Sequence, residues 1–225
     1  MSREATLQTS ENKLILPVAF VGGPGSGKSS AALYLDSYDF QETHPAIQYT
    51  YKRAMTFRMR DLLNWYIADQ GQPRPHVSEL IHKHEELRAN GEGHKIFNLF
   101  HTKLDTGIYG IDAIRHPEDL GEILAMGGLV IGLRSSQARR RELWVSDTND
   151  VKHIAVRNTK ERRAAFRRAE LEMHPMEGNP HASDITGCLD IAHEQGVLLN
   201  VSRLSKEEVN RKVIEAVASF ALEHM

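Results

Sequence analysis

A glycine-rich segment near the amino terminus constrains this chain more than any other feature of its sequence. Residues 22–29 have the sequence GGPGSGKS, which satisfies the pattern G-x-x-x-x-G-K-[ST] at every required position. The apolar run Leu14–Val21 precedes the segment, and a helical pattern over residues 28–36 follows it. Glycines allow backbone angles and close approaches that a Cβ would prevent, so successive N–H groups can point inward at an anion. The order of strand, glycine loop and helix predicts a phosphate-binding loop.

The residue types of this loop indicate how it would hold a nucleotide. Lys28 supplies a positive charge to the β and γ phosphates, the following helix adds its N-terminal dipole, and the Ser29 hydroxyl can ligate Mg²⁺. A glycine turn without a ligand is the alternative, which the flanking strand and helix disfavour. We expect ATP or GTP to bind with Mg²⁺, and ATP to be the donor. The expected nucleotide-binding residues are Gly22, Gly23, Pro24, Gly25, Ser26, Gly27, Lys28, Ser29 and Ser30.

The rest of the chain alternates short apolar runs with helical patterns. The apolar runs are typical of strands buried on both faces of a parallel sheet. The helical patterns include a capping box at Ser205 and Glu208, and a Pro at the first turn of the helix that begins at 117. Strands that alternate with helices predict an α/β fold in three layers, the P-loop NTPase fold, with a mostly parallel sheet and helices on both faces. The expected strands lie at 14–21, 108–111, 129–133 and 197–199, and the expected helices include 56–69, with Thr56 as its N-cap, and 78–89.

Composition places the chain among ordinary globular proteins. Hydrophobic residues make up 40% and charged residues 26% of its 225 residues, which suits one domain. Cys188 is the only cysteine, so neither an intramolecular disulfide nor a thiolate metal site is predicted. His82 and His84 have a spacing that puts them on different sides of a helix, which also disfavours a metal. With no membrane span or export signal expected, we predict a cytoplasmic protein; its oligomeric state stays open.

A carboxylate follows the predicted strand 108–111. Asp112 stands in the segment GIDAIRHPE, at the end of the strand where parallel strands place ligand-binding groups. There it could organise Mg²⁺ or accept a proton from an acceptor hydroxyl. The alternative is a solvated loop aspartate, in which case Asp36, Asp39 and Asp105 are the next candidates.

Several segments together resemble one branch of the P-loop proteins. VAFVGGPGSGKSS, TFRMRDLL, GIDAIRHPEDLGEI, LVIGLRSSQARRREL, FRRAELE and CLDIAHEQGVLLN occur in the order and spacing of nucleotide kinases. The chain is similar to dephospho-CoA kinase and deoxynucleoside monophosphate kinase-like proteins over most of residues 14–220. It departs from their pattern at Ala113, where they have glycine, and at His193, where they have aspartate. The resemblance implies that Arg60 and Arg115 contact the acceptor.

A basic segment gains a role from this resemblance. Residues 134–168 carry eleven Lys and Arg against four acids, an excess of seven positive charges. Kinases similar to this chain close an arginine-bearing lid over the transferred phosphoryl group, whose charge must be neutralised. The resemblance therefore implies a lid with Arg139, Arg140 and Arg157 at the phosphates. A solvated helix face, or a surface for nucleic acid, is the alternative for the remaining arginines.

Two hypotheses about function follow from the sequence. The favoured one is an ATP-dependent phosphotransferase in which Lys28, Asp112, Arg139 and Arg157 are catalytic and the acceptor is a nucleotide or a nucleotide-like small molecule. The other is a P-loop NTPase switch or nucleotide-binding module that engages a protein or nucleic acid and has no acceptor. For the favoured hypothesis we expect residues 1–12 to form a loose arm, 40–105 to bind the acceptor, and 136–182 to form the lid region.

Overall fold

One parallel sheet organises the molecule. The computed structural model describes residues 13–112, 114–146, 159–171 and 183–225, and within them five strands pair in the order β2-β3-β1-β4-β5. Every pair is parallel, so all strands end at the same edge of the sheet, here called the carboxyl edge. The strands are β1 (Ile15–Val21), β2 (Ala54–Arg58), β3 (Gly107–Asp112), β4 (Leu129–Arg134) and β5 (Val197–Asn200).

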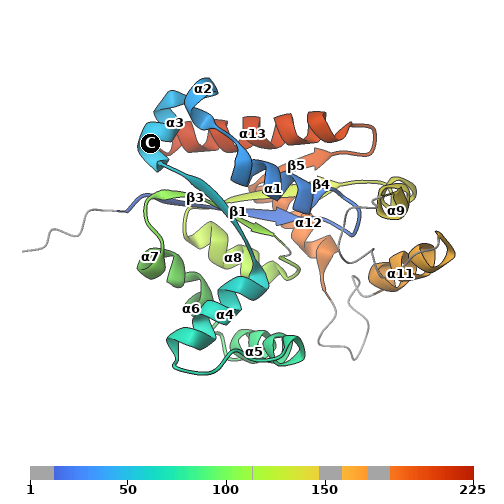
Figure 1. The fold of residues 1–225 in the computed structure, drawn as a ribbon, viewed down its shortest axis with the longest axis horizontal. Coiled ribbons are helices and arrows are strands. Elements are labelled where there is room, and N and C mark those ends of the chain that lie inside the picture. The colour runs from blue at the N-terminus through green and yellow to red at the C-terminus, as the bar shows by residue number, and fades with distance from the viewer. Residues whose placement is uncertain (1–12, 113, 147–158, 172–182) are drawn as a thin grey trace, which may run out of the picture.

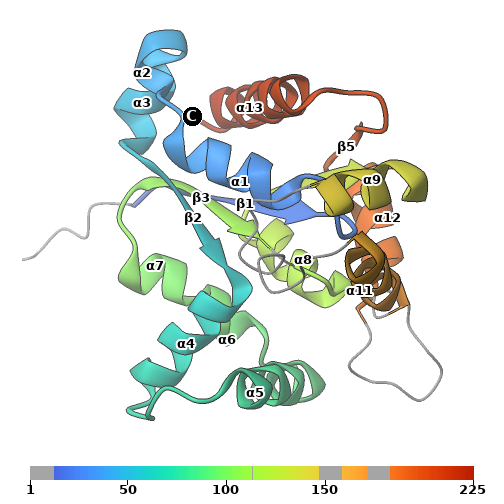
Figure 2. The ribbon, with the colours of Figure 1, turned by 45° about the vertical axis from the view of Figure 1, so that its right-hand side comes forward.

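Helices cover both faces of the sheet and complete three layers (Figures 1 and 2). One face carries α1 (Lys28–Ser37), α2 (Phe40–Thr43), α3 (Pro45–Tyr51) and α13 (Lys206–Glu223). The opposite side carries α4 (Met59–Asp69), α5 (Val77–Ala89), α6 (His94–Phe97), α7 (Leu99–Lys103), α8 (Pro117–Ala125) and α12 (Ile185–Gln195). Beyond the carboxyl edge lie α9 (Gln137–Ser146) and α11 (Thr159–Leu171).

A hydrophobic core on each face of the sheet explains why its central strands are apolar. Alternate residues of β1 point to opposite faces: Phe20 packs in the cluster under α1 and α13, whereas Ala19 and Val21 pack in the cluster that includes α4 and α8. A central strand therefore has no polar face, which is why an unbroken apolar run marks it in the sequence. The predicted fold class, an α/β fold with a parallel sheet between helical layers, is confirmed.

The beginning of the predicted helix 56–69 was wrong. Thr56 belongs to β2, and the helix begins at Met59. Two contacts with α1 hold Thr56 in the strand: its N–H donates to Asp36 Oδ1 at 2.9 Å and its hydroxyl donates to the Ala32 carbonyl at 2.8 Å. These contacts come from residues 20 and more positions away, so they override the local pattern. Asp61 accepts from the N–H of Arg58 and caps the helix.

Other local predictions are confirmed. Ser205 and Glu208 form the expected capping box at the start of α13, with bonds of 2.7 and 3.2 Å, and Pro117 opens α8. The expected arm 1–12 lies outside the described residues. The segment 40–105 contains β2 as well as helices, so part of it belongs to the sheet. No helix in the described part of the chain has the length and apolar character needed to cross a bilayer.

Candidate functional site

The glycine loop lies between β1 and α1, as the motif predicts. Gly22 and Gly25 have φ angles of 152° and 73°, which residues with a Cβ rarely adopt. A Cβ at Gly22 would lie 2.5 Å from Ser26 Oγ and 2.8 Å from the Leu133 carbonyl oxygen, and a Cβ at Gly25 would collide with the Arg140 carbonyl oxygen. The loop is therefore packed between the end of β4 and helix α9, and only glycine fits at these two positions.

The first turn of α1 continues from the loop. Gly27 is its N-cap in the left-handed conformation, and no side chain caps the helix. Lys28 is the first helical residue and is half-buried, while the following Ser29 is exposed and Ser30 is half-buried. The first N–H groups of a helix have no acceptor within the helix, and together with the helix dipole they favour an anion at this point. The arrangement suits phosphate oxygens, with the Ser29 hydroxyl open to a ligand.

Asp112 ends β3 on the face of the sheet that carries α1. Gly110, two residues earlier on the same face, lies against Leu35 of α1 and against Thr56, which bonds to Ala32. Two strand residues advance about 6.6 Å, which equals about four residues of a helix running the opposite way. Asp112 is therefore level with the first turn of α1, where Lys28 and Ser29 lie.

Two buried polar atoms at this edge lack a protein partner. Ser26 and Asp112 are 2% and 7% exposed, and within the described residues neither Ser26 Oγ nor Asp112 Oδ1 has a hydrogen-bond partner. A buried polar group without a partner costs free energy, so a native structure normally supplies one. Ser26 belongs to the glycine loop and Asp112 ends the strand next to β1. The carboxyl edge thus has the features of a site whose ligand completes its hydrogen bonds.

The oxygen atoms at this edge fit a hard divalent cation. Mg²⁺ prefers oxygen ligands and usually keeps several waters beside one or two protein groups and substrate phosphates. The Ser29 hydroxyl and the Asp112 carboxylate are two such groups at the same level of the sheet. No cluster of three metal-ligating side chains occurs among the residues that the structure describes. A cation here would therefore depend on the nucleotide for most of its ligands.

Three arginines belong to β2, to the first turn of α4 and to the segment after β3. Arg60 is in the first turn of α4, exposed, with its Nε 3.9 Å from Asp61. Arg115 is also exposed, and its carbonyl accepts the Asp184 N–H at 2.9 Å. Arg58 ends β2 in register with Asp112, so their side chains share one face of adjacent strands. Sequence analysis missed Arg58 because it missed β2.

The two helices beyond the carboxyl edge hold the expected lid arginines. Arg139 pairs with Glu142 on the same helix at 3.0 Å, both partly exposed. Arg140 pairs with Glu170 of α11 at 3.0 Å, and Gln137 donates to the same carboxylate at 3.2 Å. Glu170 is a second residue that the sequence did not single out, although FRRAELE contains it. Arg157 lies outside the described residues.

The buried His84 joins α5 to Asp119 of α8 and contacts the partly buried His116. His84 Nε2 lies 3.0 Å from Asp119 Oδ1, and the His84 and His116 rings are edge to face at 6.1 Å. Burial, followed by the charge of Arg88, lowers the pKa of His116 to about 4, so this ring is neutral near pH 7. His82, by contrast, is exposed and pairs with Glu85. The pair ties the expected acceptor-binding segment to the helix that follows Asp112.

Comparisons with known proteins add a likeness of overall fold. No protein-family model matches the chain, and no curated protein matches it significantly. Among solved structures, shikimate kinase from Acinetobacter baumannii, in complex with shikimate, is similar at 10% identity and a TM-score of 0.43 over 92% of this chain and 95% of that chain. Shikimate kinase from Bacteroides thetaiotaomicron is similar at 12% identity and a TM-score of 0.43, over 90% of this chain and 98% of that chain. A sugar kinase from a Janibacter species is similar at 10% identity and a TM-score of 0.36, over 91% of this chain and 94% of that chain. The functional assignment therefore rests on the residues of the site.

Proposed function

We propose that this protein is an ATP-dependent phosphotransferase that moves the γ-phosphoryl group of ATP to a nucleotide or a nucleotide-like small molecule. The observation that carries the proposal is the glycine loop between β1 and α1 with the unpartnered oxygen of Asp112 level with it. A phosphate loop alone is shared by enzymes and switches. A buried carboxylate at the adjacent strand end adds a group that can act on a second reactant.

The nucleotide would lie with its phosphates along the loop. The backbone N–H groups of the loop and of the first turn of α1 would donate to phosphate oxygens, and Lys28 would meet the β and γ phosphates. Ser29 and Asp112 would hold Mg²⁺, which neutralises phosphate charge when bound. The positive φ angles of Gly22, Gly25 and Gly27 support these roles, because they are backbone angles of the kind that phosphate-binding loops use.

The acceptor would approach along the carboxyl edge from the side of β2. Arg58 and Arg60 come from β2 and α4, and Arg115 comes from the segment after Asp112. In the transfer, an acceptor oxygen forms a bond to the γ phosphorus while the bond from that phosphorus to the bridging oxygen of ADP breaks. Where the attacking atom is a hydroxyl, its proton passes to the Asp112 carboxylate. A phosphate acceptor needs the arginines more than it needs the base.

The decisive experiment follows a label from ATP. The full chain is incubated with γ-labelled ATP, Mg²⁺ and single acceptors: nucleosides, nucleoside monophosphates, dephospho-CoA and shikimate. Transfer to a nucleotide or to dephospho-CoA is expected. Transfer only to shikimate would keep the reaction and reject the acceptor class, whereas label that goes only to water would favour the NTPase switch. A cytoplasmic location stays a prediction, which fractionation of cells would test.

A further inference from the structure

A buried ion pair connects the two helices beyond the carboxyl edge. Arg140 of α9 and Glu170 of α11 have side chains that are 15% and 9% exposed, and Nη2 of the arginine donates to Oε2 of the carboxylate at 3.0 Å. Gln137, one turn before Arg140, donates to the same oxygen. Burying two charges removes both from water, so such a pair is a weak source of stability. Its geometry, rather than its energy, needs an explanation.

The backbone of Arg140 rests on the phosphate loop. The space where a Cβ of Gly25 would stand is taken by the Arg140 carbonyl oxygen. Helix α9 therefore contacts the loop at the residue that bears this arginine. An arginine side chain that starts from such a point can reach a phosphate group held by the loop, provided its guanidinium is directed there.

Glu170 accepts a hydrogen bond from one nitrogen of the Arg140 guanidinium. Arginine presents five N–H donors in a rigid planar fork. Glu170 takes Nη2, while Arg140 Nε is buried and has no hydrogen-bond partner among the described residues. The pair is thus incomplete, with a donor edge that still lacks an acceptor. A phosphate oxygen is the acceptor that this donor set suits best.

The neighbouring Arg139 also has a buried Nε without a partner among the described residues, but its ion pair is of a different kind. Arg139 pairs with Glu142 three residues later on its own helix, with side chains 30% and 65% exposed. Exposed pairs of this kind hold a side chain weakly and exchange readily with water. Of the two adjacent arginines, Arg140 is therefore the one whose position is fixed from a second helix.

We propose that Glu170 is a positioning residue that holds the Arg140 guanidinium for the γ-phosphate of a bound nucleoside triphosphate. Glu170 acts through Arg140 and touches no nucleotide itself. The inference rests on the proposed function only for the presence of ATP in the loop. The opposite role would be sequestration, in which Glu170 competes with the phosphate for Arg140.

Binding of ATP and ADP separates these roles. Dissociation constants of the two nucleotides are measured with Mg²⁺ by calorimetry for the wild type, Arg140→Ala, Glu170→Gln and the double variant. The ADP-to-ATP ratio of these constants reports contacts to the γ-phosphate alone. We expect the ratio to fall about tenfold in Arg140→Ala, about threefold in Glu170→Gln, and no further in the double variant than in Arg140→Ala.

Controls exclude a general loss of structure. Glu170→Gln keeps the side-chain shape, and Arg140→Lys keeps the charge while losing the fork, so its ratio should also fall if Arg140→Ala does not fold. Glu215→Gln removes a carboxylate from an exposed pair with Arg211 on α13 and should leave the ratio unchanged. A ratio that rises in Glu170→Gln would show sequestration, and a ratio unaffected by Glu170→Gln, or effects that add in the double variant, would overturn the proposal. A wild type that binds ATP but transfers label to no acceptor would reject the proposed function and leave this test valid.

Discussion

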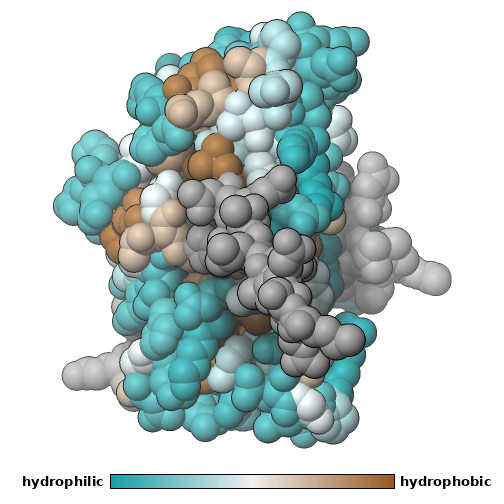
Figure 3. Space-filling view, turned by 90° about the vertical axis from the view of Figure 1, so that its left-hand side faces the viewer, coloured by the Kyte–Doolittle hydropathy of each residue, from teal (hydrophilic) through white to brown (hydrophobic). Residues whose placement is uncertain are grey.

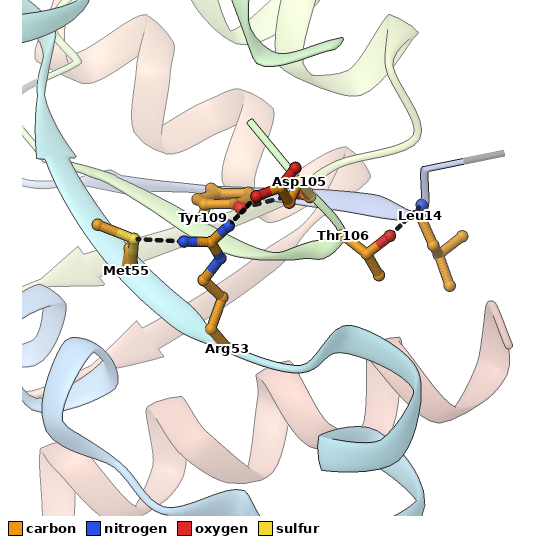
Figure 4. A network of polar contacts seen from close by, with 6 residues as sticks. All are labelled: Leu14, Arg53, Met55, Asp105, Thr106 and Tyr109. Atoms are coloured by element: carbon orange, nitrogen blue, oxygen red, sulfur yellow. Dashed lines mark hydrogen bonds and ion pairs between the residues drawn. The ribbon is translucent and has the colours of Figure 1, made fainter. Parts of the chain in front are cut away.

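The two ends of strands β2 and β3 carry polar groups in very different states. At the amino edge, Arg53 pairs with Asp105, and the Tyr109 hydroxyl donates to the Asp105 carbonyl at 2.8 Å (Figure 4). Leu14 donates its N–H to Thr106 at 3.3 Å in the same network. At the carboxyl edge, Oδ1 of Asp112 at the end of β3 and Oγ of Ser26 in the neighbouring glycine loop are buried and lack a partner within the described residues.

The amino edge needs no ligand other than water. The side chains of Arg53 and Asp105 are 44% and 74% exposed, so water completes whatever the network leaves open. Figure 3, which faces this end of the molecule, shows a largely hydrophilic surface with smaller hydrophobic areas. At the carboxyl edge, Ser26 Oγ and Asp112 Oδ1 are buried and have no hydrogen-bond partner among the described residues. Polar groups that are paired or exposed to water can serve the sheet alone, whereas buried polar groups without a partner indicate a ligand site.

Lys28→Ala is expected to have the largest effect. It removes the charge that we propose for the β and γ phosphates, so transfer from ATP should fall about a hundredfold to a thousandfold. Lys28 is half-buried in a first helical turn, so the far-ultraviolet circular dichroism spectrum should not change. Steady-state assays on the acceptor that accepts label would measure the loss. Full activity in the folded variant would remove the loop from the active site.

Asp112→Asn should have the next largest effect. The amide keeps the shape of the side chain but cannot accept a proton or neutralise Mg²⁺, so turnover should fall about a hundredfold. The melting temperature should stay the same or rise, because a buried amide costs less than a buried carboxylate whose Oδ1 has no partner among the described residues. Activity equal to the wild type would transfer the role to another carboxylate, with Asp36 the next to test.

A pair of glycine variants tests how tightly the carboxyl edge is packed. Gly25→Ala must accept a φ of 73° and a collision with the Arg140 carbonyl, whereas Gly27→Ala has a φ of 89° and open space around its Cβ. We expect Gly25→Ala to lower the free energy of unfolding by about 2 kcal/mol and Gly27→Ala by about 1 kcal/mol. Urea unfolding compares them. Equal losses would mean that α9 moves away without cost.

Arg53→Met should have the smallest effect. It breaks the amino-edge ion pair, whose side chains are largely exposed, so the free energy of unfolding should fall by less than about 1 kcal/mol. Transfer from ATP should be unchanged, because the residue stands at the opposite end of β2 from the phosphate loop. If turnover drops as it does in Asp112→Asn, the two edges are coupled and the contrast between them fails.

The sequence predicted the loop well because its determinants are contiguous. Eight residues specify the turn, and the apolar run before them specifies the strand, so no distant contact is needed. Asp112 could be placed at a strand end for the same reason, since Ile108 to Ile111 form a local apolar run. That Asp112 lies beside the first turn of α1 depends on the register between β3 and β1, which the sequence does not specify.

Residues fixed by distant partners could not be predicted. Threonine is a residue type that often caps helices, but Thr56 lies in β2 because it bonds to Asp36 and Ala32 of α1. Arg58 was missed with it. Charge counting drew attention to the arginines of residues 134–168 but could not show that Glu170 meets Arg140 across two helices. A partner 30 residues away leaves no periodic signal in the sequence.

The central place of β1 also sets the order in which the molecule can form. β1 is the first strand in the chain, yet its neighbours are β3 and β4, which end at residues 112 and 134. Pairing strands that are so distant closes long loops, which slows folding. During synthesis the glycine loop therefore emerges long before β4 and α9, which pack against it, and any nucleotide that the loop binds would meet a complete site only after these elements have left the ribosome.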